Sequence, residues 1–168
     1  METGFGEIIM SNGLLIYTLF HVALSVVMLV AGAVVVNGLL RGRDAGRWTT
    51  VFLIFTFATN ASGFGFPFVK LLPSHITSII ALLLLAAVLV ARYAFSLSGF
   101  WRGIYAGGLV FSLFFDVFVL VAQAFGKIPA LKQLAPTGAE PPFAITELVV
   151  LAAFVVLTVM AIRRSGRP

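Results

Sequence analysis

The sequence contains no cysteine and few charged residues. The absence of cysteine excludes disulfides, thiolate metal sites and CxxC redox chemistry. Charged residues make up only 10% of the 168 residues, too few to cover the surface of a soluble domain of this length. Instead, 61% of the residues are hydrophobic. They gather in runs of about 20 residues, the length typical of a transmembrane helix, so the sequence predicts a membrane protein.

Five apolar segments predict an all-α fold, a polytopic bundle of five transmembrane helices in a single domain. Each segment has about 20 residues or more, enough at about 1.5 Å per residue to cross a hydrocarbon core of about 30 Å. The predicted spans are residues 14–40, 49–68, 75–95, 103–125 and 143–162. The first span is too long for the core of a cleaved signal peptide, so it is expected to remain in the membrane.

Arginine and lysine fall on opposite sides of this five-span arrangement. All eight arginines lie in or beside the links on one side, and all three lysines lie on the other. Because cytoplasmic loops carry the excess of basic residues, the arginine side is predicted to be cytoplasmic. The N-terminus is then outside and the C-terminus inside. The basic residues thus have a topological role, and no nucleic-acid partner is predicted.

The longest link, residues 126–142, is predicted to be a structured outer loop. Apolar residues recur at three-residue spacing between Ile128 and Leu134, which indicates one or two amphipathic turns on the membrane surface. Pro136, Pro141 and Pro142 predict an extended return to the last span. The loop serves either as a stiff connector or as a lid over a cavity that opens outward.

An aspartate, Asp116, stands in the middle of the apolar stretch FSLFFDVFVL. A charged side chain at mid-membrane costs about 2.5–3.5 kcal/mol on insertion scales, so it is expected to face protein or water. Ser112 and Gln123 share its helix face, and His21 and Asn60 fall in the outer half of two other spans. Because buried polar groups need partners, these residues are expected to form a polar cluster in the bundle interior. Asp116 is expected to be neutral or hydrogen-bonded to His21 or Asn60.

This cluster either holds the helices together or forms a site for a ligand or a proton. The end of the second span, ASGFGFPF, contains two glycines and a proline, which indicate an unwound backbone beside an outward-facing pocket. The alternative is a frayed helix end. Ser62, His75 and Glu147 are expected at the rim of that pocket, and for Glu147 a solvated carboxylate near a helix start is favoured.

Two histidines raise the question of haem. Bis-histidine ligation needs two imidazoles at similar depth, and His21 is expected to lie about 10 Å deeper than His75. No cofactor and no metal site are therefore predicted.

Small residues indicate close helix contacts. Gly103 and Gly107 form a GxxxG pattern near the inner end of the fourth span. Such positions let helices approach closely, either within the chain or across an interface. The predicted partners are membrane lipids and, through these small-residue faces, either a second copy of the chain or a larger membrane complex.

The strings GFGFPF and LLPSH, the ARY that ends the third span and the loop sequence KIPAL…LAPT…EPPF resemble a family of small bacterial inner-membrane proteins of uncharacterised function. The resemblance implies a multi-pass protein of the bacterial inner membrane. It implies no activity, cofactor or catalytic residue.

The chain has no HExxH, nucleophile elbow or phosphate-binding loop. We therefore predict a non-enzymatic membrane protein with an outward-facing polar and aromatic pocket for a small or apolar ligand, acting in transport or sensing. One alternative is an accessory or assembly subunit of a larger membrane complex. A haem-binding or proton-handling redox protein is the alternative that the sequence favours least.

Overall fold

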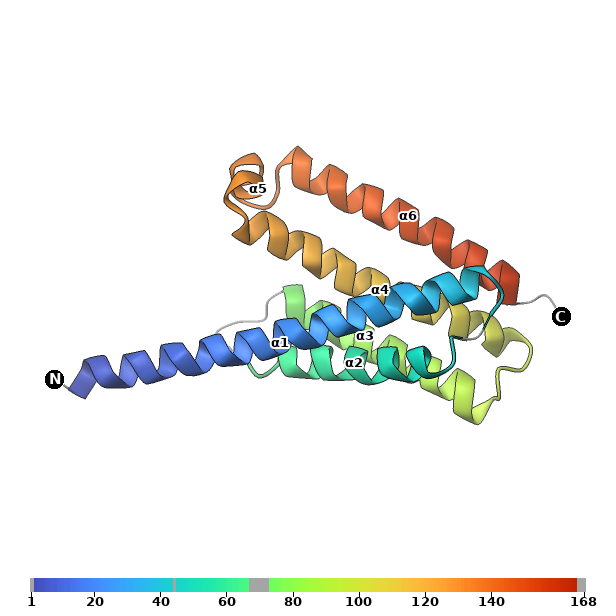
Figure 1. Ribbon diagram of the computed structural model, residues 1–168. Helices are drawn as coiled ribbons and strands as arrows, with labels where there is room; N and C mark the ends of the chain where they lie inside the picture. The colour runs from blue at the N-terminus through green and yellow to red at the C-terminus, as the bar shows by residue number, and fades with distance from the viewer. Residues whose placement is uncertain (1, 44, 67–72, 166–168) are drawn as a thin grey trace.

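The computed structural model describes residues 2–43, 45–66 and 73–165 (Figure 1). It is 86% helix, and the described ranges contain no strand, which confirms the predicted all-α fold class. In chain order the elements are α1 (Glu2–Leu40), α2 (Arg47–Gly63), α3 (Pro73–Leu89), the π-helical turn η1 (Val90–Ala94), α4 (Phe100–Lys127), α5 (Pro129–Leu134) and α6 (Pro141–Ser165).

Four helical segments are long and apolar enough to cross a membrane. They are Asn12–Leu40, His75–Ala94, Phe100–Lys127 and Pro141–Ser165. Each of them coincides with a predicted span to within three residues at either end. These four helices indicate a membrane-embedded protein, as the composition predicts.

The predicted second span, residues 49–68, is wrong as a full-length helix. α2 has 17 residues and ends at Gly63. At about 1.5 Å per residue it is about 25 Å long, shorter than a hydrocarbon core of about 30 Å. The helix closes where glycine becomes frequent, because glycine is among the poorest helix formers. The predicted break at Pro67 lies outside the described residues.

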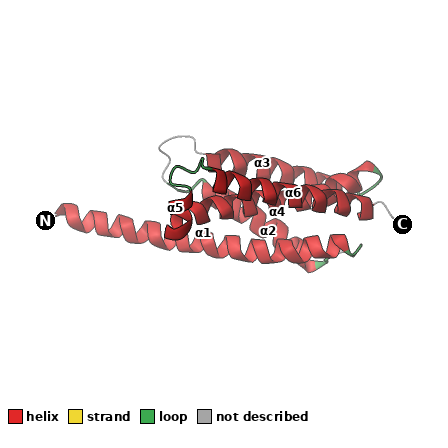
Figure 2. Cartoon of the chain, turned by 90° about the horizontal axis from the view of Figure 1, so that it is seen from above, coloured by secondary structure: helices red, strands yellow, loops and turns green. Residues whose placement is uncertain are grey.

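Successive long helices run in opposite directions and lie side by side in one bundle (Figures 1 and 2). One end of the bundle holds the α1–α2 link, the α3–α4 link and the C-terminal end of α6. We call it the arginine end, because every described arginine lies in these segments or in the helix ends next to them. The opposite end holds α5 with Lys127 and Lys132, and we call it the lysine end. The predicted separation of arginine from lysine is therefore seen in the described residues.

α4 is the most buried of the four long helices and contacts α1, α3 and α6. Its small residues make these contacts close. A Cβ atom at Gly107 would lie 3.1 Å from Cδ1 of Ile162 in α6, and one at Gly108 would lie 2.5 Å from Cγ2 of Val88 in α3. Gly103 also faces Ile162. The predicted GxxxG pattern therefore packs helices within the chain.

The link between α4 and α6 contains the short helix α5, where helical turns are predicted, and a turn closed by Glu140. Its Oε1 atom accepts hydrogen bonds from the backbone N–H of Thr137 (3.0 Å) and from the Thr137 hydroxyl (2.9 Å). The predicted extended return at Pro141 and Pro142 is wrong, because both prolines belong to the first turn of α6. Proline suits a first helical turn, where its missing N–H has no helical acceptor.

Candidate functional site

The polar face of α4 carries Ser112 and Asp116 into the protein. Ser112 is 1% exposed and Asp116 is half-buried. Oγ of Ser112 and Oδ2 of Asp116 are buried and form no hydrogen bond with any described residue. Gln123, about two turns nearer the lysine end, is exposed. The structure therefore places Gln123 outside the predicted cluster.

α2 contributes four buried polar side chains: Thr49 near the arginine end, and Thr56, Thr59 and Asn60 farther along the helix. The Nδ2 atom of Asn60 donates to the carbonyl oxygen of Thr56 at 2.9 Å, within its own helix. This bond replaces the predicted bond to Asp116. The hydroxyl oxygens of Thr56 and Thr59 are buried, and neither has a hydrogen-bond partner in the part of the chain that the structure describes.

Contacts with α1 bring the polar faces of α2 and α4 to the same level. A Cβ atom at Gly32 would lie 2.7 Å from Cδ1 of Leu113 and 2.8 Å from Cε2 of Phe52, so the three helices meet at this glycine. α2 and α4 both run from the arginine end towards the lysine end. Asp116 lies about 4.5 Å beyond Leu113 and Thr56 about 6 Å beyond Phe52, so the two side chains share a level of the bundle.

We call four of these buried atoms the oxygen layer. They are Oγ1 of Thr56, Oγ1 of Thr59, Oγ of Ser112 and Oδ2 of Asp116. The layer combines three hydroxyl groups with one carboxyl group, and the described lysines and arginines all lie at the ends of the bundle. Such a donor set suits a hydrogen-bonding guest or a hard cation, which prefers oxygen ligands.

His21 does not join the oxygen layer through a hydrogen bond; it bonds α1 to the end of α2. Its Nδ1 atom lies 2.8 Å from Oγ of Ser62, so Ser62, expected at a pocket rim, is the direct partner of His21. The hydroxyl of Tyr17 donates to the carbonyl oxygen of Ser62 at 2.6 Å. The ring of Phe66 packs edge-on against the rings of Tyr17 and His21. The predicted bond between His21 and Asp116 is therefore replaced by a contact with α2.

His75 and Glu147 are buried rather than placed at an open rim. His75 lies in the first turn of α3, is 6% exposed and has its ring 5.7 Å from the ring of Phe64. Glu147 is 8% exposed, and neither of its carboxylate oxygens has a hydrogen-bond partner among the described residues. The expectation of a solvated Glu147 is wrong, because α6 turns this side chain towards the protein instead of towards the end of the bundle.

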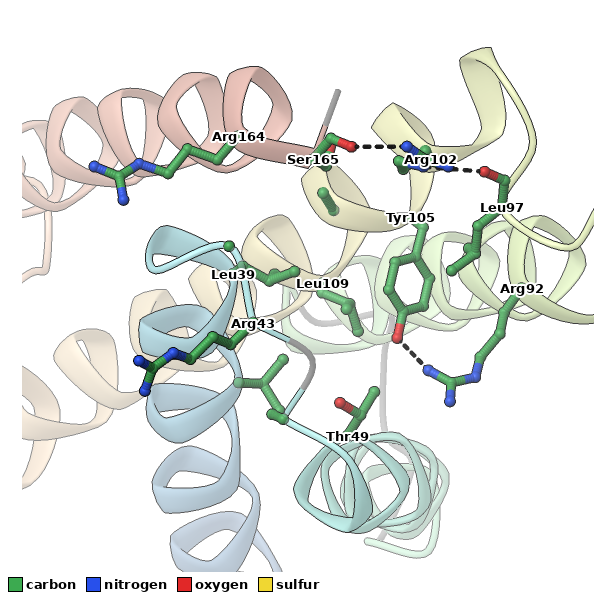
Figure 3. A pocket seen from close by; sticks show the side chains of 14 residues that line it. Leu39, Arg43, Thr49, Arg92, Leu97, Arg102, Tyr105, Leu109, Arg164 and Ser165 are labelled. Carbon is green, nitrogen blue, oxygen red and sulfur yellow. Dashed lines mark hydrogen bonds between the residues drawn. The ribbon is translucent and has the colours of Figure 1, made fainter. Parts of the chain in front are cut away.

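Sequence reasoning missed a hollow at the arginine end (Figure 3). It has a volume of about 260 Å³ and is lined by residues from α1, α2, η1, α4 and α6 and from the links between them. Four arginines, Arg43, Arg92, Arg102 and Arg164, contribute to its wall. The sequence carries a signal for it, since all the arginines flank spans on one side. The positive-inside rule already explains arginines on one side of the membrane, so the pattern does not by itself indicate a hollow.

With this geometry described, the chain can be set beside known proteins. No family model, curated protein or solved structure matches it. The resemblance to small bacterial inner-membrane proteins therefore stays a prediction, and the functional argument depends on the sites themselves.

Proposed function

We propose that this chain is a non-enzymatic, multi-pass membrane protein that binds a small metal cation at the oxygen layer, in transport or sensing. One observation carries the proposal. Four buried side-chain oxygens, two from α2 and two from α4, have no hydrogen-bond partner among the described residues, and the residues Thr56 and Asp116 lie near one level. In native proteins buried polar atoms of this kind have partners, so a cluster without them favours a guest.

The chemistry of the layer favours a hard cation as the guest. Carboxylate and hydroxyl oxygens are the ligands that such cations take, and the layer supplies one carboxyl group with three hydroxyls. A bound cation would neutralise Asp116 in an apolar environment, where an isolated carboxylate is costly. Sodium and its alkali neighbours suit a site with a single carboxylate, because one negative charge balances one positive charge.

The proposal includes the topology that the sequence predicts. α1 and α3 run in the same direction, and α2 runs back between them, which supports a fifth crossing by α2. The arginine end is proposed to be cytoplasmic, with the N-terminus outside, in the bacterial inner membrane. The oxygen layer then lies nearer the outer face than the cytoplasmic one.

The role of an assembly subunit receives less support. Its sequence signal was the small-residue faces, and Gly103, Gly107 and Gly108 are occupied by contacts with α6 and α3. Association with a second copy or a larger complex stays a prediction, and it would have to use other surfaces of the chain.

Cation-dependent thermal stability tests the proposed site. The full chain in neutral detergent is heated in lithium, sodium, potassium or choline chloride at equal ionic strength. At least one alkali cation is expected to raise the melting temperature above that in choline, by about 3–5 °C at tenfold its Kd. Asp116→Asn and Thr56→Val are expected to abolish the difference.

Glu147→Gln is the matched control, because it neutralises the other buried carboxyl group while leaving the oxygen layer intact. It is expected to keep the wild-type cation response. If the wild type and Asp116→Asn respond alike to all four salts, the oxygen layer is not a cation site. Loss of the response in Glu147→Gln alone would also overturn the proposal.

A further inference from the structure

The hollow at the arginine end collects basic side chains from segments that are far apart in the sequence. Arg43 comes from the α1–α2 link, Arg92 from η1, Arg102 from α4 and Arg164 from α6. The cavity they line has a volume of about 260 Å³ (Figure 3). We call it the arginine pocket. It lies at the opposite end of α4 from Lys127 and is independent of the oxygen layer.

Two of the four arginines are held in the wall of the pocket by hydrogen bonds. Nη1 of Arg92 donates to the hydroxyl of Tyr105. Arg102 donates from Nε to the carbonyl oxygen of Leu97 at 3.3 Å and from Nη1 to that of Ser165 at 3.4 Å. Arg102 thus ties the start of α4 to the end of α6. The two bonds of Arg102 are to neutral carbonyl oxygens.

The other two arginines are free to bind a guest. Arg43 and Arg164 are exposed, and neither guanidinium group forms a hydrogen bond or an ion pair with a described residue. Figure 3 shows both side chains extending to the same side, one from the α1–α2 link and one from α6, with their guanidinium groups directed away from Tyr105 and Arg92. Because both residues line the hollow and are exposed, their side chains can turn towards a guest at its mouth.

The charge around the pocket is strongly one-sided. The chain has six acidic residues, and Asp44 is the one that the sequence places at the arginine end. Asp44 lies outside the described residues. Eight arginines against one aspartate leave a large positive excess there, so the pocket attracts anions.

The floor of the pocket is apolar. Leu109 and Val35 are each 1% exposed, and Leu39, Ala106 and Leu97 complete the lining between the basic side chains. A second hollow of about 290 Å³ is lined mainly by apolar residues of α2 and α3. Its lining includes Thr50 and Tyr93, which follow the pocket residues Thr49 and Arg92 directly in the sequence. A guest with a charged head and an apolar tail fits this combination.

Orientation in the membrane explains basic residues near span ends, but it does not explain their convergence. Arg41, Arg47 and Arg163 also lie at the arginine end, and none of them lines the pocket. Topology depends on the number of basic residues on each side rather than on the direction in which they point. The convergence of four arginines from four segments on one hollow therefore requires another reason.

We propose that the arginine pocket binds a phosphate ester, with Arg43 and Arg164 donating hydrogen bonds to its oxygens. Guanidinium is the side-chain group best matched to phosphate, because its planar N–H donors bind two oxygens at once. The apolar floor favours an anionic phospholipid of the adjacent leaflet as the source of the phosphate. Basic pockets between transmembrane helices bind such headgroups on the cytoplasmic side.

Binding is measured on the full chain in neutral detergent by native mass spectrometry and by the shift in melting temperature. Three compounds are titrated: a phosphatidylglycerol, a phosphatidylcholine of the same chain length, and the water-soluble glycerol phosphate. Phosphatidylglycerol is expected to bind and stabilise at lower concentration than phosphatidylcholine, since the latter has no net charge for the arginines to neutralise. If glycerol phosphate competes as well as the lipid, the pocket still binds a phosphate ester, and its source is soluble.

Matched double variants separate the pocket from general surface charge. The double variant Arg43→Gln/Arg164→Gln removes the two exposed guanidinium groups of the pocket. Its apparent affinity for phosphatidylglycerol is expected to fall at least about tenfold, because charge-assisted hydrogen bonds to the phosphate are lost. Arg41→Gln with Arg163→Gln removes the same charge at the same end, outside the pocket. This control is expected to keep the wild-type affinity within about threefold, because exposed charges that make no hydrogen bond to the guest contribute little.

Two results would overturn the proposal. One is equal binding of the two lipids by the wild type. The other is an equal loss of affinity in the two double variants, which would mean that total charge rather than the pocket decides. All four substituted arginines are exposed, and the melting temperature of each variant without lipid verifies that it folds.

Discussion

The Nδ1 atom of His21 lies 2.8 Å from Oγ of Ser62, and the Ser62 hydroxyl donates to the carbonyl oxygen of Thr59 at 3.0 Å. A hydroxyl has one proton to donate, so the imidazole must donate to Ser62 from Nδ1. In the neutral ring Nε2 is then an acceptor. This bond joins α1 to the end of α2, beside the bond from Tyr17 to the Ser62 carbonyl, and selects one tautomer of His21.

This bond is expected to stabilise the fold by about 0.5–1.5 kcal/mol, the net value of a typical buried hydrogen bond. His21→Phe, Ser62→Ala and the double variant form a cycle, and their free energies of unfolding in detergent give the coupling. Ser25→Ala is the control, since the Ser25 hydroxyl donates to a carbonyl of its own helix at 2.9 Å. A coupling near zero would mean that the two side chains are held by packing alone.

Asp116 is expected to tolerate an amide but not an alkyl group. Asp116→Asn keeps the shape and the hydrogen-bonding oxygen, so in choline chloride its free energy of unfolding is expected to match the wild type within about 0.5 kcal/mol. Asp116→Leu leaves the hydroxyls of Thr56 and Ser112 beside an apolar group and is expected to cost about 1–3 kcal/mol. If Asn is as damaging as Leu, the carboxylate is charged and paired with a specific cation even in that buffer.

Gly32 is expected to be irreplaceable, because its hydrogen atom faces Leu113 and Phe52 at the junction of three helices. A Cβ atom there would lie under 3.0 Å from both side chains, so Gly32→Ala is expected to destabilise the protein by about 1–3 kcal/mol. Gly126→Ala makes the same change in α4 with nothing within 4 Å of the new methyl group. It is expected to be neutral or to stabilise by up to about 1 kcal/mol through helix propensity. Equal unfolding free energies for both variants would contradict close packing at Gly32.

The turn closed by Glu140 is expected to loosen in acid. Desolvation acts to raise the pKa of Glu140, but hydrogen bonds from Thr137 and Ala139 outweigh it and hold the pKa below its usual value. A group whose pKa is lowered on folding stabilises the structure above its unfolded pKa, and this contribution is lost as the pH falls through the lower folded pKa.

Hydrogen exchange of the Thr137 amide measures this loss. Its protection is expected to decrease in the wild type as the pH falls below the usual glutamate pKa. In Glu140→Gln, which has no carboxyl group to titrate, protection corrected for intrinsic exchange is expected to be independent of pH. A flat profile in the wild type would rule out the carboxylate as the acceptor that orders the turn.

The topology can be tested with single cysteines, because the chain contains none. Ser98→Cys places a thiol in the α3–α4 link at the arginine end, and Gln133→Cys places one on α5 at the lysine end; both sites are exposed. With the arginine end in the cytoplasm, a membrane-impermeant maleimide is expected to label Gln133→Cys on intact cells and Ser98→Cys only after lysis. Labelling of Ser98→Cys on intact cells and of Gln133→Cys only after lysis would mean that the orientation is the reverse of the one proposed. Labelling of both cysteines on intact cells would contradict a single crossing of the membrane by α4 between them.

The sequence by itself determined the helices that span and the division of charge between the two ends. The length of an apolar run is a local property that is compared directly with the thickness of the bilayer. The sequence therefore predicts the limits of the four candidate spans, 12–40, 75–94, 100–127 and 141–165, to within three residues. The separation of arginine from lysine followed from counting links. α2 is the exception: the glycines at its end shorten the helix, which stops at Gly63 instead of continuing to residue 68.

Only the tertiary structure decided which polar groups meet. His21 bonds Ser62 rather than Asp116, Glu147 is buried, and four arginines line one hollow. These outcomes depend on how each helix is rotated about its axis and on where its neighbours begin. In a soluble helix an apolar stripe reports that rotation, whereas a helix that is apolar on all sides, as α1 and α6 nearly are, carries no such stripe. Close contacts at glycine then set the rotation, and they arise only when the helices pack.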